Sequence, residues 1–432
     1  DSCPRPVAML ARFGRSLARL ARPSFAPLAY SSSTIASDSA SLRAAGAVAV
    51  ASALAVAIYT VEEQRRASCE PWLGKDVSLV MAGDCGGTNS RLQIFKVPND
   101  AKLVVGQPPP GELLFAKKYE NHEFSNFTVV CQRFLEDAAM YTGGIVPAAC
   151  CLACAGAISE NSVEFTNVAS GWNIHGAKLE RELGIKRVVL INDFVAQGYG
   201  LLTLSDDEKV LLNKGTYVPG APVACVGAGT GLGECFLTAA SDGTYTCWPS
   251  EGGHVEFSPR NELGLDLLHH LREKFADKKR VSIERVVSGP GIASIYEFLR
   301  GHWAFSGRVD PAIDQAFVDA PPHKQAVVVS KGAAAKDAVC EEAIDLFSEC
   351  YGAEVGNAVL KWLPKGGMYV SGGIAAKNPD WIKSETFLAA YHSKGRLSPQ
   401  LAQTPLFLVL TEDTGERGAL YCAVQTLLGT FA

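Results

Sequence analysis

Val-Ser-Leu-Val-Met-Ala-Gly-Asp-Cys-Gly-Gly-Thr-Asn-Ser-Arg-Leu-Gln-Ile-Phe-Lys-Val, at residues 77–97, is the stretch that decides the fold. An apolar run at 77–82 leads into a turn with two adjacent glycines, and a second apolar run follows at 92–97. Short apolar runs bounded by glycine are typical of buried strands, so the stretch predicts a strand, a tight turn and a second strand. From this point the chain has the pattern of an α/β protein.

The turn between these runs is suited to binding phosphate. Gly86 and Gly87 would let backbone N–H groups approach phosphate oxygens, and Asp84 could hold a hydrated Mg²⁺ beside them. Further hydrogen-bond donors follow at Thr88, Asn89 and Arg91. The turn is neither a Walker A loop nor a dinucleotide-binding fingerprint, because it lacks the Gly-Lys pair and enters a strand rather than a helix. Taken alone, it could also be an ordinary turn.

A second hairpin of the same kind lies further along the chain. The apolar run 222–226 is followed by Gly-Ala-Gly-Thr-Gly-Leu-Gly-Glu at 227–234 and by another apolar run at 235–237. Two such hairpins predict a duplicated domain in which each copy holds one side of a nucleotide's phosphates. This is the organisation of the actin-like ATPases, and the alternative is two unrelated turns.

Polar side chains near these hairpins suggest acid–base and sugar-binding chemistry. The strand predicted at 187–191, one arginine followed by four apolar residues, ends in Asn-Asp, and a carboxylate at the mouth of a strand, here Asp193, could activate a hydroxyl group. The alternative for this pair is a helix N-cap. Glu251 and His254 are separated by two glycines, so both could face one polyol, although a lone histidine is often a core residue. Glu284 offers a further carboxylate before a helix start.

Together these segments resemble the bacterial-type glucokinases of the hexokinase superfamily, from about residue 77 to the C-terminus. The resemblance rests on six motifs in the family's order: Asp-Cys-Gly-Gly-Thr-Asn-Ser-Arg (84–91), Ile-Asn-Asp-Phe (191–194), Gly-Thr-Gly-Leu-Gly (229–233), Glu-Gly-Gly-His-Val-Glu-Phe (251–257), Glu-Arg-Val-Val-Ser-Gly-Pro-Gly (284–291) and Gly-Gly-Met-Tyr-Val-Ser-Gly-Gly-Ile (366–374). The resemblance implies a two-lobed actin-like ATPase (ribonuclease H-like) fold and ATP-dependent phosphorylation of the glucose 6-hydroxyl.

The resemblance also implies a role for each matching residue. Asp193 would be the general base, and Asp84 would position Mg²⁺. The sugar, glucose or a similar hexose, would be bound by Asn167, Asn192, Glu251, His254 and Glu284. ATP would be bound by Asp84, Gly86, Gly87, Thr88, Asn89, Arg91, Gly229, Thr230, Gly231, Gly372 and Gly373, the last two lying against the adenosine. The reaction would be a direct in-line phosphoryl transfer.

Departures from the family pattern leave some points open. Residues 99–112 lengthen the first hairpin region, and residues 302–324 lengthen a later loop. The segment 412–419 differs from the commonest bacterial form near the expected adenosine edge. A polyphosphate or ADP donor therefore stays open beside ATP, and so does a kinase for another hexose or an N-acetylhexosamine.

Length and composition are consistent with the prediction of a two-lobed sugar kinase. The 432 residues suffice for two or three folding units, and 47% of them are hydrophobic. The net charge of −5, without a basic run in the body of the chain, argues against a nucleic-acid partner. We expect a small α/β lobe at 77–192 and a large α/β lobe at 193–432, with the last helix returning towards the small lobe.

The N-terminal region has a different character. Within residues 1–43, an arginine-rich, acid-poor amphipathic segment is followed by a serine-rich tract. This pattern predicts a helical transit peptide, for a mitochondrion rather than a plastid. The alternative is a tail without a targeting role. Residues 44–61 are uncharged and just long enough to cross a bilayer, so we expect an inner-membrane anchor, with a linker at 62–76. The alternatives for 44–61 are a remnant of the transit peptide and a surface helix. This extension motivates a rival hypothesis, in which a catalytically silent, glucokinase-derived subunit is anchored in a mitochondrial protein complex.

Overall fold

The computed structural model describes residues 74, 76–165, 171–276 and 280–431. These residues lie within one compact unit that spans positions 69–432. The predicted transit peptide and anchor, and nearly all of the linker, fall outside the described residues. Among the helices that are described, none combines the length and the apolar character needed to cross a bilayer.

The first sheet contains the first glycine hairpin. Its strand order is β3-β2-β1-β4-β7, in which β1 pairs antiparallel with β2 and parallel with β4. The bounds are β1 Val77–Cys85, β2 Asn89–Pro98, β3 Glu112–Glu120, β4 Ala149–Cys154 and β7 Arg187–Asn192. The parallel strands β1, β4 and β7 end at the same edge of the sheet, where α/β proteins usually bind ligands.

The second sheet repeats this arrangement around the second glycine hairpin. Its order is β11-β10-β9-β12-β13-β8, with β9 antiparallel to β10 and parallel to β12. The bounds are β8 Lys209–Asn213, β9 Val223–Ala228, β10 Leu232–Ala239, β11 Tyr245–Ser250, β12 Met368–Ser371 and β13 Leu406–Val409. Three antiparallel strands followed by two parallel ones thus occur in both sheets. The fold is the two-lobed actin-like ATPase fold expected from the two hairpins.

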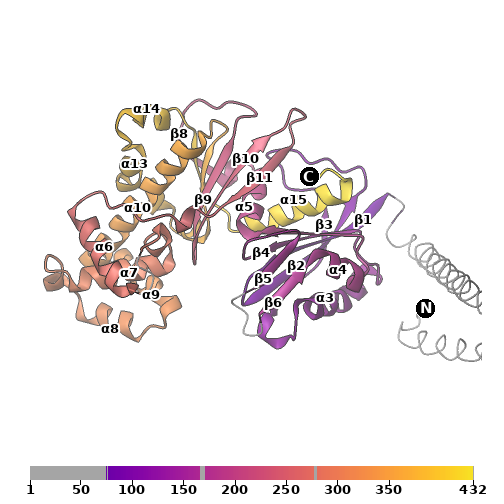
Figure 1. Ribbon diagram of the computed structural model, residues 1–432, viewed down its shortest axis with the longest axis horizontal. Coiled ribbons are helices and arrows are strands. Elements are labelled where there is room, and N and C mark those ends of the chain that lie inside the picture. The colour runs from indigo at the N-terminus through magenta and orange to yellow at the C-terminus, as the bar shows by residue number, and fades with distance from the viewer. Residues whose placement is uncertain (1–73, 75, 166–170, 277–279, 432) are drawn as a thin grey trace, which may run out of the picture. The chain divides into compact units, whose positions relative to one another are not determined.

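Helices cover both sheets. Those packed with the first sheet are α3 Phe127–Thr142, α4 Gly176–Leu183, α5 Asp193–Leu201 and α15 Thr414–Leu428. The remaining helices are α6 Glu262–Lys274, α7 Gly289–Gly301, α8 Pro311–Asp319, α9 Pro322–Ala334, α10 Ala338–Trp362, α11 Gly373–Lys377, α12 Pro379–Lys383, α13 Glu385–His392 and α14 Ser398–Ala402. Figure 1 shows the last helix, α15, beside β1, β4 and α5, although it follows β13 in the sequence.

Short elements complete the connections. They are the two-stranded sheet of β5 Ser162–Phe165 and β6 Trp172–His175, and the 3₁₀ turns η1 Asn121–Glu123, η2 Asp206–Glu208, η3 Gly252–His254, η5 Ile283–Arg285, η6 Ser306–Arg308 and η7 Gly395–Leu397.

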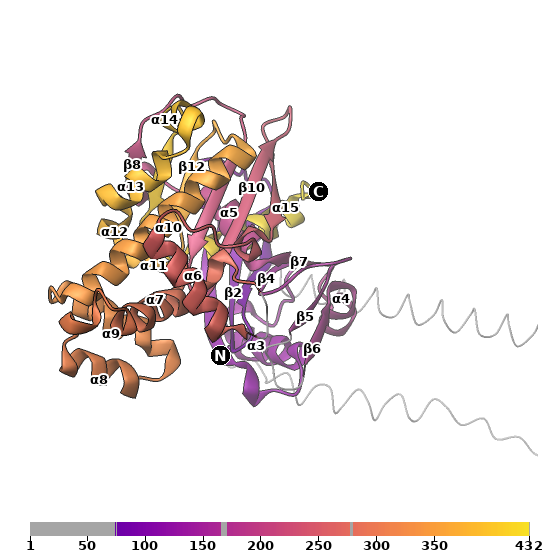
Figure 2. The same ribbon diagram turned by 60° about the vertical axis from the view of Figure 1, so that its left-hand side comes forward.

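One buried cluster joins the two sheets through α5 and α15. It contains Val80 and Ala82 of β1 together with Val223 and Cys225 of β9. The long helix α10 packs on the second sheet on its other side, as Figure 2 shows beside β10 and β12. The strands of both glycine hairpins therefore pack into a common core.

One expectation about the large lobe was wrong. Residues 302–324 do not form an extended loop but contain η6, all of α8 and the start of α9. The Asp310 side chain accepts hydrogen bonds from the N–H groups of Ala312 and Ile313, and Pro311 occupies the first turn of the helix. An aspartate N-cap followed by proline is a helix-start signal that the sequence analysis overlooked.

Candidate active site

The first glycine turn is braced by a buried asparagine. Asn121 Nδ2 donates hydrogen bonds to the carbonyl oxygens of Gly86, at 2.7 Å, and Gly87, at 3.2 Å. Its Oδ1 accepts a hydrogen bond from Ser90 Oγ at 2.8 Å, and its backbone N–H donates to Thr88 O at 2.9 Å. The glycine carbonyl groups are therefore held on the side of the turn that faces Asn121.

The second glycine turn is braced by Glu284. Glu284 Oε2 accepts the backbone N–H of Leu232 at 2.9 Å, and a Cβ atom at Gly231 would lie 2.5 Å from the same oxygen. The N–H of Gly289, at the start of α7, donates to Gly229 O at 2.8 Å. A residue expected to bind the sugar thus also fixes the turn expected to bind phosphate.

Asp193 lies at the junction of β7 and α5. Asn192 is the N-cap of α5, and its Oδ1 accepts the N–H groups of Phe194, at 2.9 Å, and Val195, at 3.2 Å. Asn192 Nδ2 donates to Asp193 Oδ1 at 3.0 Å. Because Asn192 is the cap, the carboxylate of Asp193 occupies the first turn of the helix and remains accessible to water.

Asp84 and Asp193 are close enough to influence each other's charge. Because β4 lies between β1 and β7, the end of β1 near Asp84 and the end of β7 before Asp193 are two strand spacings apart, which is roughly 10 Å. The surrounding protein raises the pKa of Asp193 by desolvation, its bond from the Phe194 N–H opposes this, and the charge of Asp84 raises it further. Desolvation also raises the pKa of Asp84, and nearby Arg91 opposes that rise.

Phe194 connects the base candidate to the second hairpin. A Cβ atom at Gly233 would overlap the Phe194 ring, and one at Gly227 would lie 2.9 Å from it. The ring therefore rests directly on β9 and β10 at two paired glycines. Since Phe194 follows Asp193 in α5, this contact holds the Asp193 carboxylate at the place where the two sheets meet.

Glu251 and His254 face each other across the η3 turn. His254 Nε2 lies 3.9 Å from Glu251 Oε2, and both side chains are more than half exposed to solvent. The backbone carbonyl of His254 accepts a hydrogen bond from Arg280 Nη1 at 2.6 Å. This arrangement offers a carboxylate and an imidazole together to a ligand.

Arg91 is engaged with acidic groups rather than free. Arg91 Nη1 lies 3.7 Å from Asp84 Oδ2 and 3.3 Å from Glu416 Oε1, at the start of α15. Gln93 Nε2 also donates to Glu416, at 3.1 Å. The α15 helix thus contributes a carboxylate to the first hairpin.

Gly372 follows β12 and lies beside the second turn. It has a φ of 87° and separates β12 from α11, and a Cβ atom there would lie 2.6 Å from Ala228 O. Gly373 lies near the ion pair between Lys377 Nζ and Glu412 Oε2, which are 2.6 Å apart. Both glycines are therefore next to the strand end that leads into Gly229.

The structure thus brings most of the predicted residues to the adjoining ends of the two sheets. The residues near the first turn are Asp84, Gly86, Gly87, Thr88, Asn89 and Arg91, and those near the second are Gly229, Thr230, Gly231, Glu284, Gly372 and Gly373. Asn192 and Asp193 lie between them, and Glu251 and His254 follow β11. Asn167 falls outside the described residues.

Several supporting residues were missed by sequence reasoning. Asn121, Phe194 and Glu416 contact the glycine hairpins from distant parts of the chain or through ring packing. Phe194 stood inside a recognised motif and could have been considered. Nothing in the sequence around Asn121 or Glu416 indicates the contact that each makes.

The donor set near the first turn fits Mg²⁺. This ion prefers carboxylate oxygens and water, and is usually bound by one or two carboxylates together with substrate phosphates. Asp84 supplies such a carboxylate beside a turn whose glycines leave room for phosphate. A second cluster, Glu120, His122 and Glu123 on and before η1, is exposed and lies in a different element.

Comparison with known proteins agrees with this fold. A family model described as Glucokinase matches residues 81–426. A glucokinase from Nostoc sp. is 37% identical over 356 residues, covering 81% of this chain and all of the relative, and one from Synechocystis sp. is 36% identical, covering 80% and 98%. The crystal structure of a glucokinase from Balamuthia mandrillaris in complex with glucose aligns with a TM-score of 0.66 at 21% identity, covering 85% of this chain and 98% of that one. With a family match across most of its length, the chain belongs to the glucokinase family.

Proposed function

We propose that the chain transfers the γ-phosphoryl group of ATP to the 6-hydroxyl of glucose, with Asp193 as the general base. The observation that carries the proposal is the position of Asp193. Its carboxylate lies at the end of β7, near Asp84 of the first hairpin, while the adjacent Phe194 ring rests on the second hairpin. A hydroxyl group bound there would lie between a base and the phosphate-binding turns.

The pKa of Asp193 supports this role. Desolvation, and to a smaller extent the charge of Asp84, raises its pKa above the usual aspartate value. A carboxylate with a raised pKa accepts a proton more readily, and general bases work best when their pKa approaches the operating pH. Asn192 Nδ2, which donates to Asp193 Oδ1 at 3.0 Å, orients the carboxylate.

Sugar binding would fall to the polar groups around this carboxylate. Glu251 and His254 would bind hydroxyl groups, since their exposed side chains point toward one another. Glu284 and Asn192 would bind further hydroxyl groups, as the family resemblance suggests, and Asn167 is a further candidate. A carboxylate can accept two hydroxyl hydrogen bonds, so a small set of such residues can fix the orientation of a hexose.

The two glycine turns would hold the phosphates of ATP. Backbone N–H groups at Gly86–Thr88 and at Gly229–Gly231 would face the phosphate oxygens, and the Gly372–Gly373 segment would lie against the adenosine. Mg²⁺ bound near Asp84 would neutralise negative charge on the phosphates. Phosphoryl transfer depends mainly on such positioning and charge neutralisation.

Similar proteins support glucose as the substrate. Curated relatives at 36–37% identity are named glucokinases, and they match this chain over almost their full length. A kinase for mannose or an N-acetylhexosamine is the alternative within the same fold. A panel of these sugars, compared by kcat/KM, distinguishes the two.

A coupled assay for glucose 6-phosphate on the full chain tests the proposal. We expect Asp193→Asn to lower kcat by about 10²–10⁴-fold, because the carboxylate that takes the proton is lost. The matched control is Asp207→Asn, which changes an exposed carboxylate on η2. A retained kcat in Asp193→Asn would contradict the base assignment. A folded wild-type chain without activity on any sugar would favour the silent-subunit hypothesis instead.

The N-terminal sequence supports a second, independent proposal about location. We propose that residues 1–43 direct the chain to a mitochondrion and that residues 44–61 anchor it in the inner membrane. The support is the amphipathic arginine pattern and the uncharged run. Import into isolated mitochondria followed by alkaline extraction tests it. Release of the chain into the soluble fraction would contradict the anchor.

A further inference from the structure

Glu234 is a buried carboxyl group that the proposed mechanism does not use. It lies on β10, three residues beyond Gly231, and is 1% exposed to solvent. Neither of its carboxyl oxygens has a hydrogen-bond partner among the described residues. Burial of an unpaired, ionised carboxylate is costly, so this group should either hold a proton or have a close counter-ion.

The neighbours of Glu234 on α10 offer one shared cation and a second acid. Lys361 Nζ lies 4.0 Å from Glu234 Oε2 and 3.0 Å from Glu354 Oε1. Glu354 is also buried, and its Oε2 accepts a hydrogen bond from Asn357 Nδ2 at 3.0 Å. The ammonium group is thus closer to Glu354, which is the better paired of the two carboxylates.

These contacts favour a proton on Glu234. Burial, and after it the negative charge of Glu354, raises the pKa of Glu234 to about 8, while Lys361 opposes the rise. A protonated Glu234 can donate a hydrogen bond to Glu354, and this would pair an oxygen that is otherwise without a partner. Near neutral pH Glu234 therefore holds a proton.

Glu234 lies directly beneath the η3 turn. A Cβ atom at Gly252 would overlap the Glu234 carboxyl group, and one at Gly253 would overlap Leu232 O. Gly252 and Gly253 are both buried, whereas Glu251 and His254 on either side of them are exposed. The backbone between the two proposed sugar-binding side chains therefore rests on β10 and on this carboxyl group.

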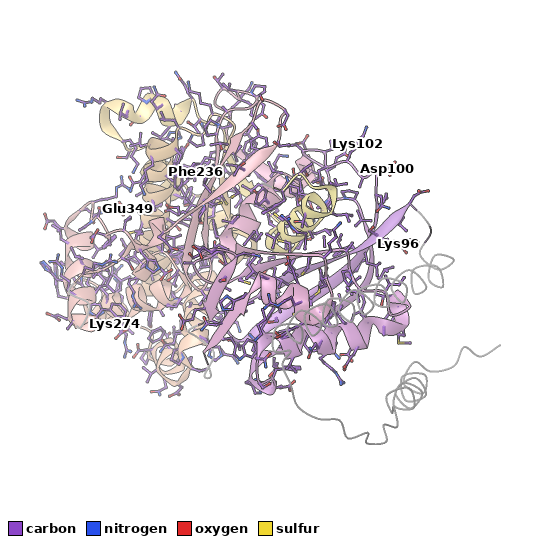
Figure 3. All side chains as sticks on the ribbon, turned by 45° about the vertical axis from the view of Figure 1, so that its right-hand side comes forward. Lys96, Asp100, Lys102, Phe236, Lys274 and Glu349 are labelled. Carbon is purple, nitrogen blue, oxygen red and sulfur yellow. The ribbon has the colours of Figure 1, made fainter. Side chains whose placement is uncertain are left out.

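The face of β10 that carries Glu234 is packed on α10. Phe236, labelled in Figure 3, lies two residues further on the same face and stacks on Trp362 with ring centroids 5.6 Å apart. Glu234 has a fixed position because this packing leaves it little freedom to turn towards solvent. An added charge at this position must therefore be accommodated by movement of its neighbours.

The charged and titratable groups that face Glu234 come from α10. They are Glu354, Lys361 and the hydroxyl of Tyr351, while the η3 turn meets Glu234 with Gly252 and carries Glu251 and His254 as exposed side chains. Lys394, just before η7, donates to Asn357 Oδ1 at 2.6 Å and so lies behind Glu354. The paired residues on β9 and β11, Val226 and Ser250, carry no charge.

We propose that Glu234 is a positioning residue for sugar binding, because its protonated carboxyl group, hydrogen-bonded to Glu354, supports the η3 turn that carries Glu251 and His254. Loss of the proton places a second negative charge beside Glu354 and beneath Gly252. The turn then shifts, and the affinity for the sugar falls while the phosphoryl-transfer step is less affected. This inference rests on the proposed function, since sugar binding by the turn is part of that proposal.

The pH dependence of KM for glucose tests the inference. In the wild-type full chain, KM should rise above about pH 8, by about tenfold per pH unit if the ionised form does not bind sugar. Glu234→Gln keeps the shape and the hydrogen-bond donor but cannot ionise, so its KM should stay near the wild-type value at pH 7 and remain flat to pH 9. Glu349→Gln, on the same helix α10 and labelled in Figure 3, is the matched control and should follow the wild type. Parallel KM profiles for wild type and Glu234→Gln would overturn the inference.

A second pair of variants tests the contact itself. Gly252→Ala should raise KM for glucose, because its methyl group would overlap the Glu234 carboxyl group. Addition of Glu234→Ala should recover part of that loss by making room, which is a non-additive effect expected only for residues in contact. Additive effects of the two substitutions would count against the contact.

A third measurement separates this inference from the proposed function. Urea unfolding of the wild type and of Glu234→Gln requires no sugar. Because the folded-state pKa lies above the unfolded value, stability contributed by the Glu234 proton is present below pH 4.5 and is lost as the pH rises to about 8. Wild type should therefore lose stability relative to Glu234→Gln over this interval, even if the chain phosphorylates no glucose. Parallel stability curves would overturn the protonation of Glu234 whatever the activity.

Discussion

The two glycine hairpins have the same topology but differ in the second residue pair from the turn. In the first hairpin Asp84 pairs with Arg91, and in the second Gly227 pairs with Gly233. The first pair is charged and partly exposed, whereas the second is covered by the Phe194 ring. The first hairpin therefore contributes charge to the site, and the second contributes a flat surface on which the start of α5 rests.

The hairpins also differ in what braces their turns. The first turn is held by Asn121, a neutral amide with no proposed role in substrate binding. The second is held by Glu284, a carboxylate that we expect to bind the sugar. A sugar hydroxyl bound to Glu284 would share its carboxylate with the Leu232 N–H. A bound sugar can therefore affect the conformation of the second turn directly, whereas the first turn is held by Asn121 of its own lobe.

Among the variants that test this difference between the hairpins, the largest expected effect comes from the surface beneath Phe194. Gly233→Ala adds a methyl group that overlaps the Phe194 ring, so the start of α5 must move and carry Asp193 with it. We expect kcat in the glucose 6-phosphate assay to fall by roughly 10²-fold, since a displacement of about 1 Å at a reacting group can have that effect.

The matched control lies at the first hairpin. A methyl group at Gly83 would meet the side-chain ends of Leu92, at 2.7 Å, and Leu152, at 2.8 Å, rather than a site residue. Gly83→Ala should therefore cost about 1–3 kcal/mol of stability with little change in kcat. Phe194→Leu in the Gly233→Ala background should restore part of the rate. Equal kcat values for the two alanine variants would refute the division of roles between the hairpins.

A second prediction concerns the charge of the first hairpin. Asp84→Asn removes the carboxylate expected to position Mg²⁺, and the metal concentration needed for half-maximal activity should rise by about tenfold or more. KM for glucose should change much less, because Glu251, His254 and Glu284 are untouched. Magnesium titrations at saturating glucose measure the effect. An unchanged magnesium requirement would show that Asp84 does not serve the metal.

The brace of the first turn gives a third, smaller effect. Asn121→Ala leaves the hydroxyl of Ser90 and the carbonyl group of Gly86 without the partner that Asn121 supplies. We expect a loss of about 1–3 kcal/mol in the free energy of unfolding. Urea denaturation of this variant and of Asn126→Ala, which removes only the exposed N-cap of α3, measures it. KM for ATP should rise, and KM for glucose should not. A rise in KM for glucose would contradict the division of roles between the two turns.

Local sequence patterns were enough to predict part of this site. The strands around 77–97 and 222–237 follow from apolar runs bounded by glycine. The capping alternative for Asn192-Asp193 is also correct in part, because Asn192 caps α5. Because the cap is Asn192 rather than Asp193, the Asp193 side chain remains accessible in the first turn of the helix.

Contacts between distant segments could not be predicted in this way. The Asn121 side chain reaches back to Gly86, and Glu416 reaches Arg91 across most of the chain length. Glu234 stands next to a recognised motif, but its burial depends on α10, which follows much later. Such contacts result from the packing of whole helices and strands. A single sequence contains no local pattern that predicts which distant elements pack together.

The smallest expected effect is a pH shift caused by the ion pair of the first hairpin. Arg91 lowers the pKa of Asp84 against the larger effect of desolvation, so Arg91→Gln should raise that pKa. Asp84 would then become protonated at a higher pH, and the acid limb of the kcat/KM profile for ATP should move upward by a fraction of a pH unit. The Arg91 side chain is 54% exposed, so stability should change by no more than about 1 kcal/mol. Gln93→Leu, which removes only the neutral contact to Glu416, is the control and should leave the acid limb in place. An acid limb that stays in place in Arg91→Gln would mean that the guanidinium has little influence on the Asp84 carboxylate, and Asp84 would then contribute to the first hairpin independently of its ion pair.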